Sequence, residues 1–162
     1  MIVFSNTTPL IALSSIGHLS LLRAVFNEIR IVDVVVSECA AGGKIVVPDV
    51  ANLDWIHVVT SLPCEPDSVL MRLDAGEKHT LNMAVKMKAD FVIIDEKLGR
   101  NIAEYLGVPV IGTLGVLLKA KQLGMIPSFV ECVHGMLNFG LRYNTNLVKK
   151  LAGYVGETFL MK

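Results

Sequence analysis

The first 22 residues contain no Lys, Arg, Asp or Glu, and Arg23 is the first charged side chain. This stretch does not fit a membrane span, because turn-forming and polar residues interrupt it at 5–9, 14–15 and 17–18. It also lacks the basic region that begins a signal peptide. We therefore expect a soluble, cytoplasmic protein that does not associate with membranes.

Cysteine and histidine are scarce and lack metal-binding spacing. The three cysteines form no C-x-x-C pair, and their odd number is typical of free thiols in a reducing compartment. The four histidines show no H-x-x-x-H spacing, so a zinc site is not expected. These residues are Cys39, Cys64, Cys132, His18, His57, His79 and His134.

Glycine-rich phosphate loops are also missing. Neither G-x-G-x-x-G nor G-x-x-x-x-G-K-[ST] occurs, and the run 112–115 is too short to be either motif. This absence argues against a nucleotide-binding α/β domain. No arrangement of a Ser or Cys nucleophile is indicated.

The chain has no net charge, with 15 basic and 15 acidic residues, but the two signs are unevenly distributed. Residues 1–96 hold 7 Lys and Arg against 12 Asp and Glu, whereas residues 97–162 hold 8 against 3. One interpretation is a cation-binding pocket beside a rim that binds a polyanion. The alternative is an uneven distribution of solvated charges.

Hydrophobic residues make up 52% of the chain, enough for a sizeable core in one domain. Short β-branched runs alternate with helical periodicity, which predicts an α/β sandwich with a parallel sheet of four or five strands flanked by helices. We place the strands at 2–4, 29–32, 55–59 (an edge strand), 91–94 and 108–111. We place helices at 10–26 (in two pieces), 70–88, 97–106 and 114–123, and two more after residue 128. A further short helix follows Asp33, its expected N-cap, and ends at about residue 41. The whole of 1–162 is expected to form one domain, with 128–162 as a C-terminal helical extension packed on it.

Three polar residues follow predicted strands, where ligands collect in an open parallel sheet. They are Asn6, Asp95 and Thr113. The alternative is that each one caps the helix that follows it, because Asn, Asp and Thr all do this well.

Two glutamates fall on apolar helix stripes. Glu77 lies midway between Leu73 and Leu81 at four-residue spacing, and burying a carboxylate there is costly unless it is paired or bound to a cation. A capping box with Asp74 as N-cap is the competing explanation. Glu38 lies beyond the first turn of its own helix, so it cannot cap it. If Asn6, Glu38, Glu77 and Asp95 converge, their oxygens suit Mg²⁺ or Mn²⁺.

Three segments of the sequence resemble the PIN-domain nucleases: 3–11 (VFSNTTPLI), 73–77 (LDAGE) and 93–100 (IIDEKLGR). A fourth, 107–121, resembles one prokaryotic branch of them, the DUF3368 group of VapC-like toxin relatives. The resemblance covers roughly residues 1–142.

The resemblance implies a Rossmann-like PIN fold, one or two bound Mg²⁺ or Mn²⁺ ions, and endonucleolytic hydrolysis of RNA. It assigns metal binding and catalysis to Asn6, Glu38, Glu77 and Asp95, with Glu96 and Thr113 supporting them. Asn6 departs from the family pattern, because it stands where the first strand normally ends in aspartate. An amide oxygen can coordinate a cation but adds no negative charge. The alternative function is therefore a weakened or inactive PIN scaffold that binds RNA or a partner protein.

Four basic residues after the acidic half, Lys97, Arg100, Lys119 and Lys121, are candidates for contacts with the RNA backbone. The alternative for each is a solvated helix face. The resemblance further implies a small antitoxin partner and a homodimer. The apolar stretch 154–161 is a candidate for packing in such a dimer, for partner binding, or for closing the core.

Overall fold

The computed structural model describes residues 1–161 and contains one five-stranded parallel sheet of order β3-β2-β1-β4-β5. The expected α/β architecture, with the 55–59 segment at an edge, is confirmed. The strands are β1 (Val3–Ser5), β2 (Ile29–Val32), β3 (Ile56–Val59), β4 (Phe91–Ile93) and β5 (Val110–Ile111). The central strand β1 is flanked by β2 and β4, so its carboxyl end lies between theirs.

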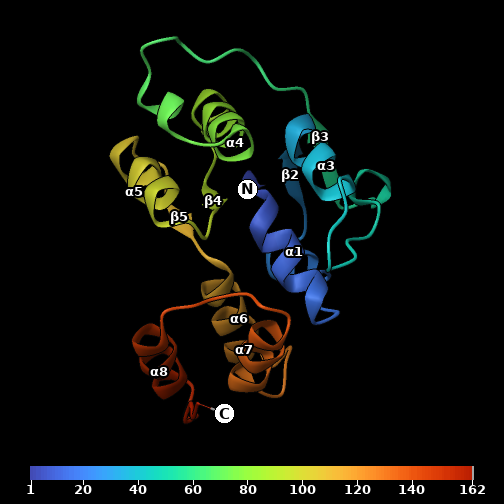
Figure 1. The fold of residues 1–162 in the computed structure, drawn as a ribbon, viewed down its shortest axis with the longest axis vertical. Coiled ribbons are helices and arrows are strands. Elements are labelled where there is room, and N and C mark those ends of the chain that lie inside the picture. The colour runs from blue at the N-terminus through green and yellow to red at the C-terminus, as the bar shows by residue number, and fades with distance from the viewer. Residues whose placement is uncertain (162) are drawn as a thin grey trace.

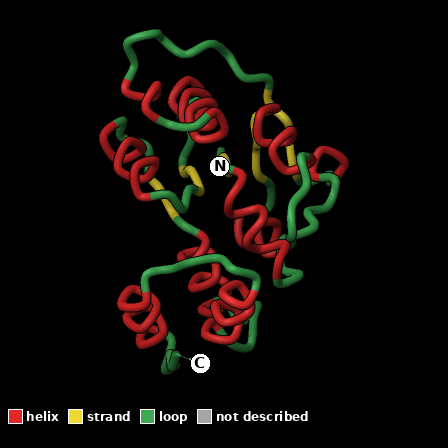
Figure 2. The backbone as a smooth tube through the Cα atoms, in the orientation of Figure 1, coloured by secondary structure: helices red, strands yellow, loops and turns green. Residues whose placement is uncertain are grey.

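Eight α-helices flank the sheet within residues 1–161 (Figures 1 and 2). They are α1 (Thr7–Ser15), α2 (Leu21–Phe26), α3 (Asp33–Ala40), α4 (Ala75–Lys86), α5 (Lys97–Tyr105), α6 (Thr113–Gln122), α7 (Phe129–Asn138) and α8 (Thr145–Tyr154), with 3-10 turns η1 (Val50–Asn52) and η2 (Val69–Arg72). The helix α3 packs against both α1 and α4. The helices α6, α7 and α8 gather at one end of the molecule, away from α4 (Figure 1).

Several predicted helix boundaries were wrong. The first helix begins at Thr7 rather than at residue 10, and η2 and α4 replace one continuous helix over 70–88. The break comes at Leu73 and Asp74, which are both extended, and the Asp74 side chain caps the start of α4. Asp33 is the first residue of α3 instead of its N-cap, and its carboxylate accepts a hydrogen bond from the Ser61 N–H at 3.1 Å.

The core lies between the sheet and the helices. Its largest fully buried side chains come from strands and helices alike, including Phe4, Ile31, Ile93, Leu117 and Phe129. The β-branched strand residues are buried because helices cover the sheet. The three cysteines are free thiols. No helix within residues 1–161 combines the length and the apolar composition needed to cross a bilayer.

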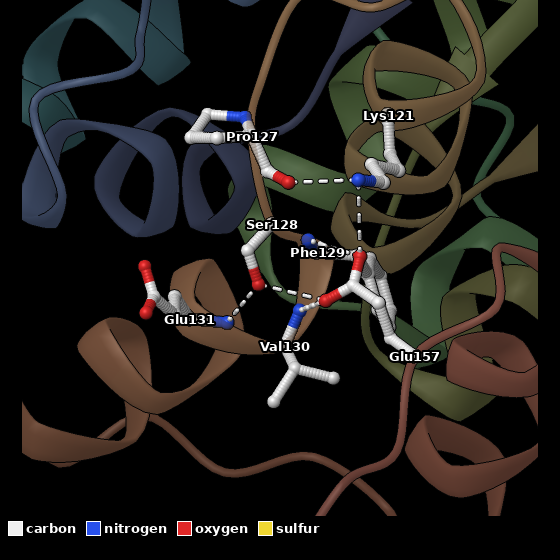
Figure 3. Close-up of polar contacts among 7 residues, drawn as sticks. All are labelled: Lys121, Pro127, Ser128, Phe129, Val130, Glu131 and Glu157. Carbon is white, nitrogen blue, oxygen red and sulfur yellow. Dashed lines mark hydrogen bonds and ion pairs between the residues drawn. The ribbon is translucent and has the colours of Figure 1, made fainter.

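A carboxylate fastens the chain after α8 to the start of α7 (Figure 3). Glu157 accepts hydrogen bonds from Ser128 Oγ (2.7 Å), Phe129 N (2.9 Å) and Val130 N (3.0 Å). Burial alone would raise the pKa of Glu157, but these hydrogen bonds and the nearby Lys121 outweigh it and lower the pKa. The negative charge also suits the positive end of α7.

The division that treats 128–162 as an extension of the domain stays a prediction.

Candidate metal centre

Asn6 carries a buried amide oxygen that has no partner. The residue follows β1, is only 3% exposed, and its N–H donates to the Ile93 carbonyl of β4 at 3.0 Å. It occupies the N-cap position of α1, yet its side chain makes no capping hydrogen bond. Oδ1 is buried and unpaired among the described residues. Capping therefore does not explain Asn6, whereas a bound cation would satisfy this oxygen.

Glu77 carries a second oxygen of this kind. Asp74 Oδ1 accepts a hydrogen bond from the Glu77 N–H at 3.0 Å, so the predicted cap of α4 is present. The Oε2 atom of the Glu77 carboxyl is buried and unpaired within the described chain. Burial first, then Asp74 and the charges of Glu96 and Glu38, raise the pKa of Glu77 to about 8. A cation would relieve the same electrostatic cost.

Gly76 is the point where Asn6 and Glu38 meet. A Cβ atom at position 76 would collide with Glu38 Oε1 and would lie 3.1 Å from Asn6 Oδ1. The half-buried Glu38 carboxylate accepts a hydrogen bond from Thr7 Oγ1 at 2.5 Å. Asn6, at the start of α1, and Glu38 of α3 thus lie side by side at Gly76, while Glu77 follows Gly76 on α4 and interacts with the charge of Glu38. We call Asn6, Glu38 and Glu77 the oxygen cluster.

A second glycine leaves room for the same cluster. A Cβ atom at Gly99 of α5 would collide with Glu77 Oε2 and would lie 3.0 Å from Ile94 Cγ2. Sequence reasoning did not single out Gly76 or Gly99. Each glycine leaves space for side chains that come from other parts of the chain. The local sequence pattern does not show which side chains these are.

We predict that Gly76→Ala weakens Mn²⁺ binding about tenfold or more while the protein stays folded. The new methyl group meets the flexible end of Glu38, which can move aside but then leaves the cluster. Alanine also favours a helix over glycine by up to about 1 kcal/mol, which offsets the local crowding. Calorimetric titration with Mn²⁺ and thermal unfolding measure the two effects.

Gly153→Ala is the matched control, because Gly153 lies in α8 with no atom within 4 Å of its would-be Cβ. This variant should gain helix stability and bind Mn²⁺ as the wild type does. Unchanged Mn²⁺ affinity in Gly76→Ala would contradict the placement of Glu38 in the cluster.

Asp95 follows β4, and its predicted role as a metal ligand stays a prediction. Its two oxygens accept hydrogen bonds from the N–H (2.7 Å) and Oγ1 (2.6 Å) of Thr113. Burial raises the pKa of Asp95, while Thr113 and the cation of Arg100 oppose that shift. Asp95 therefore holds the start of α6, and it does not cap α5, the helix that follows it in sequence.

No three His, Cys, Asp or Glu side chains in the described part of the chain lie close enough to hold a metal ion together. A cation at the oxygen cluster would consequently depend on the amide of Asn6 beside Glu38 and Glu77. Glu96 is exposed and acts on Glu77 through its charge. Thr113 is fully buried and fixes Asp95.

A pocket of about 690 Å³ adjoins Asp95 and Glu96, and we call it the side pocket. One wall is α5, with Lys97 and Arg100, and the other is the segment 140–147 between α7 and α8. That segment crosses the start of α6 (Figure 1). Arg142 and Tyr143 line the pocket, and sequence reasoning missed both. No motif marks them, because only the return of this segment brings them to α5.

The predicted basic residues are thus divided by the fold. Lys97 and Arg100 line the side pocket, whereas Lys119 is exposed on α6 outside it. The Lys121 ammonium donates to the Pro127 carbonyl at 2.7 Å and lies 3.7 Å from Glu157 Oε2 (Figure 3). Lys121 therefore serves the packing of the C-terminal helices.

Comparisons with known proteins agree with this fold. One solved structure, a PilT N-terminus domain protein from the hyperthermophilic archaeon Sulfolobus solfataricus P2, is similar with a TM-score of 0.58 and 20% identity over 74% of this chain and 93% of that chain. Among curated proteins, no significant match is found. A family model described as a PIN domain, DUF3368, matches residues 2–157 and so includes α7 and α8. The chain belongs to this PIN-domain family.

Proposed function

We propose that the protein is a divalent-metal-dependent endoribonuclease that hydrolyses RNA phosphodiesters. Membership of the PIN-domain family supports a nuclease-like fold. The observation that carries the proposal is that two oxygens, Asn6 Oδ1 beside the Glu38 carboxylate and Glu77 Oε2 on the same helix as Gly76, are buried without a partner in residues 1–161. Buried polar atoms in folded proteins are nearly always paired with protein, water or an ion, and a cation would pair both of these oxygens.

The oxygen cluster fits Mg²⁺ or Mn²⁺. Its donors are carboxylate and amide oxygens, the ligands that hard cations prefer, and it contains no sulfur or imidazole. Asn6, Glu38 and Glu77 would hold the ion. When bound, the ion would lower the pKa of a water molecule and neutralise charge on the phosphate under attack.

The chain's other residues would position the substrate. Asp95 is held by Thr113 and lines the side pocket together with Lys97 and Arg100. Arg100 is close to Asp95, since both flank Gly112. We assign Asp95 the task of fixing this wall and extending the negative field toward the cluster, and Arg100 the task of binding substrate phosphate.

The experiment is cleavage of a fluorescently labelled single-stranded RNA in Mn²⁺, in Mg²⁺ and in EDTA. We expect cleavage by the wild type with metal only, and a loss of about 10²-fold in Asp95→Ala because the wall that it fixes with Thr113 is released. Equal rates in the variant and the wild type, or no cleavage with either metal, would overturn the proposal.

A second function is favoured by one observation: Asn6 brings no negative charge to the cluster. In this alternative the scaffold binds RNA or a partner protein without turnover, and EDTA leaves that binding unchanged. A toxin role in the cytoplasm, with a small antitoxin and a homodimer, remains part of the first proposal. Size-exclusion chromatography with light scattering tests the dimer.

A further inference from the structure

Three cationic side chains line the side pocket, and one of them, Arg100, lies near Asp95. Lys97, Arg100 and Arg142 line it, and none of them forms an ion pair within residues 1–161. Lys97 and Arg142 are exposed, and Arg100 is half-buried. Arginine binds phosphate through two parallel hydrogen bonds, so free guanidinium groups at a pocket rim suit a phosphodiester backbone.

The remainder of the pocket has the chemistry of a base-binding site. Tyr143, Leu141 and Leu147 supply aromatic and apolar surface, while Asn101 and Asn144 supply amides. Asn144 Oδ1 already accepts from the Leu147 N–H at 2.9 Å, which leaves its amide donors available. Amides recognise base edges, and apolar or aromatic side chains pack on base faces.

The position of the pocket links it to the candidate metal centre. Glu96 lines the pocket and its charge acts on Glu77, and Gly99 of α5, the helix that carries Lys97 and Arg100, lies against Glu77 Oε2. A chain whose phosphate lies at the oxygen cluster would therefore reach the side pocket with its neighbouring nucleotide. A volume of about 690 Å³ is within the usual range for a small bound ligand.

We propose that the side pocket binds one unpaired nucleotide of single-stranded RNA, adjacent to the phosphodiester at the oxygen cluster. Arg142 and Lys97 contact the backbone phosphate, and the base lies against Tyr143. This inference rests on the proposed function for the position of the cleaved bond. Because a paired base is stacked inside a helix, the pocket selects single strands over duplexes.

The test is binding of a fluorescein-labelled single-stranded RNA by anisotropy, in EDTA so that no cleavage occurs, over a series of salt concentrations. Arg142→Ala should weaken binding about tenfold, the usual effect of losing one charged hydrogen bond. It should also reduce the slope of log K against log salt by about 0.7, and Lys97→Ala with Arg142→Ala by about 1.4. Arg23→Ala, an exposed arginine on α2 outside the pocket, is the matched control and should leave both quantities unchanged.

Competition completes the experiment. The unlabelled single strand should displace the probe, and the same sequence as a duplex should compete at least tenfold less well. Wild-type affinity and salt slope in both pocket variants, equal competition by the duplex, or no binding of the single strand would overturn the inference. If Arg142→Ala weakens binding but no metal supports cleavage, the proposed function fails and the nucleotide pocket stands.

Discussion

Glu77→Gln is expected to abolish metal-dependent RNA cleavage, with a loss of about 10²-fold or more, and to stabilise the metal-free protein at pH 8. The substitution replaces a carboxylate that is 5% exposed and whose Oε2 has no partner within residues 1–161. Without metal, that charge destabilises the fold. With metal, the same charge is needed to hold the ion.

The pH dependence of stability follows from the pKa of about 8, compared with an ordinary value of 4.5. Between these two values the folded protein retains a proton that the unfolded chain has released. The free energy of unfolding of metal-free wild type should therefore fall as pH rises through this range, by on the order of a few kcal/mol. Glu77→Gln should lack this decline.

Thermal unfolding in EDTA from pH 4.5 to 9, with and without excess Mn²⁺, measures both effects. Because Mn²⁺ displaces the Glu77 proton, it should raise the melting temperature of wild type more at pH 8 than at pH 6. Glu65→Gln, at an exposed glutamate in the segment before η2, is the control. Equal pH profiles for wild type and Glu77→Gln would contradict the raised pKa of the Glu77 carboxyl and the destabilisation by its buried charge.

Asn6→Asp is expected to tighten Mn²⁺ binding about tenfold and to increase RNA cleavage severalfold. The substitution keeps the size and the position of Oδ1 while adding the negative charge that the amide lacks. In EDTA the same variant should be less stable than wild type, because a further carboxylate joins Glu38 and Glu77. Calorimetric titration with Mn²⁺ and RNA cleavage rates provide the measurements.

The control for added charge is Asn146→Asp, at an exposed position of α8. It should change neither metal affinity nor cleavage. If Asn6→Asp gains no metal affinity and no cleavage, the amide does not limit catalysis. The binding-module alternative would then account better for the scaffold.

The sequence was informative wherever a signal is local. The β-branched run at 29–32 predicted β2 with its observed bounds, and the cap at Asp74 was readable from its three-residue spacing to Glu77. The unusual position of Glu77 on an apolar stripe pointed to a buried carboxylate, which is what the structure contains.

Contacts between residues far apart in the sequence could not be predicted from local patterns. Asp95 was expected either to bind metal or to cap α5. It does not cap α5 but accepts hydrogen bonds from Thr113 at the start of α6, because β4 and β5 are neighbours and bring their carboxyl ends together. Its role as a metal ligand stays a prediction. Arg142 and Tyr143 were missed for a related reason. They lie in a segment whose return to α5 depends on how α7 and α8 pack.

The central claim is that Asn6, Glu38 and Glu77 share one cation. A crystal structure grown in Mn²⁺, with anomalous diffraction to locate manganese, tests it most directly. We predict a peak about 2.1 Å from Asn6 Oδ1 and Glu77 Oε2, bounded by the Glu38 carboxylate. Manganese found only elsewhere, with these two oxygens still unpaired at saturating Mn²⁺, would contradict the claim.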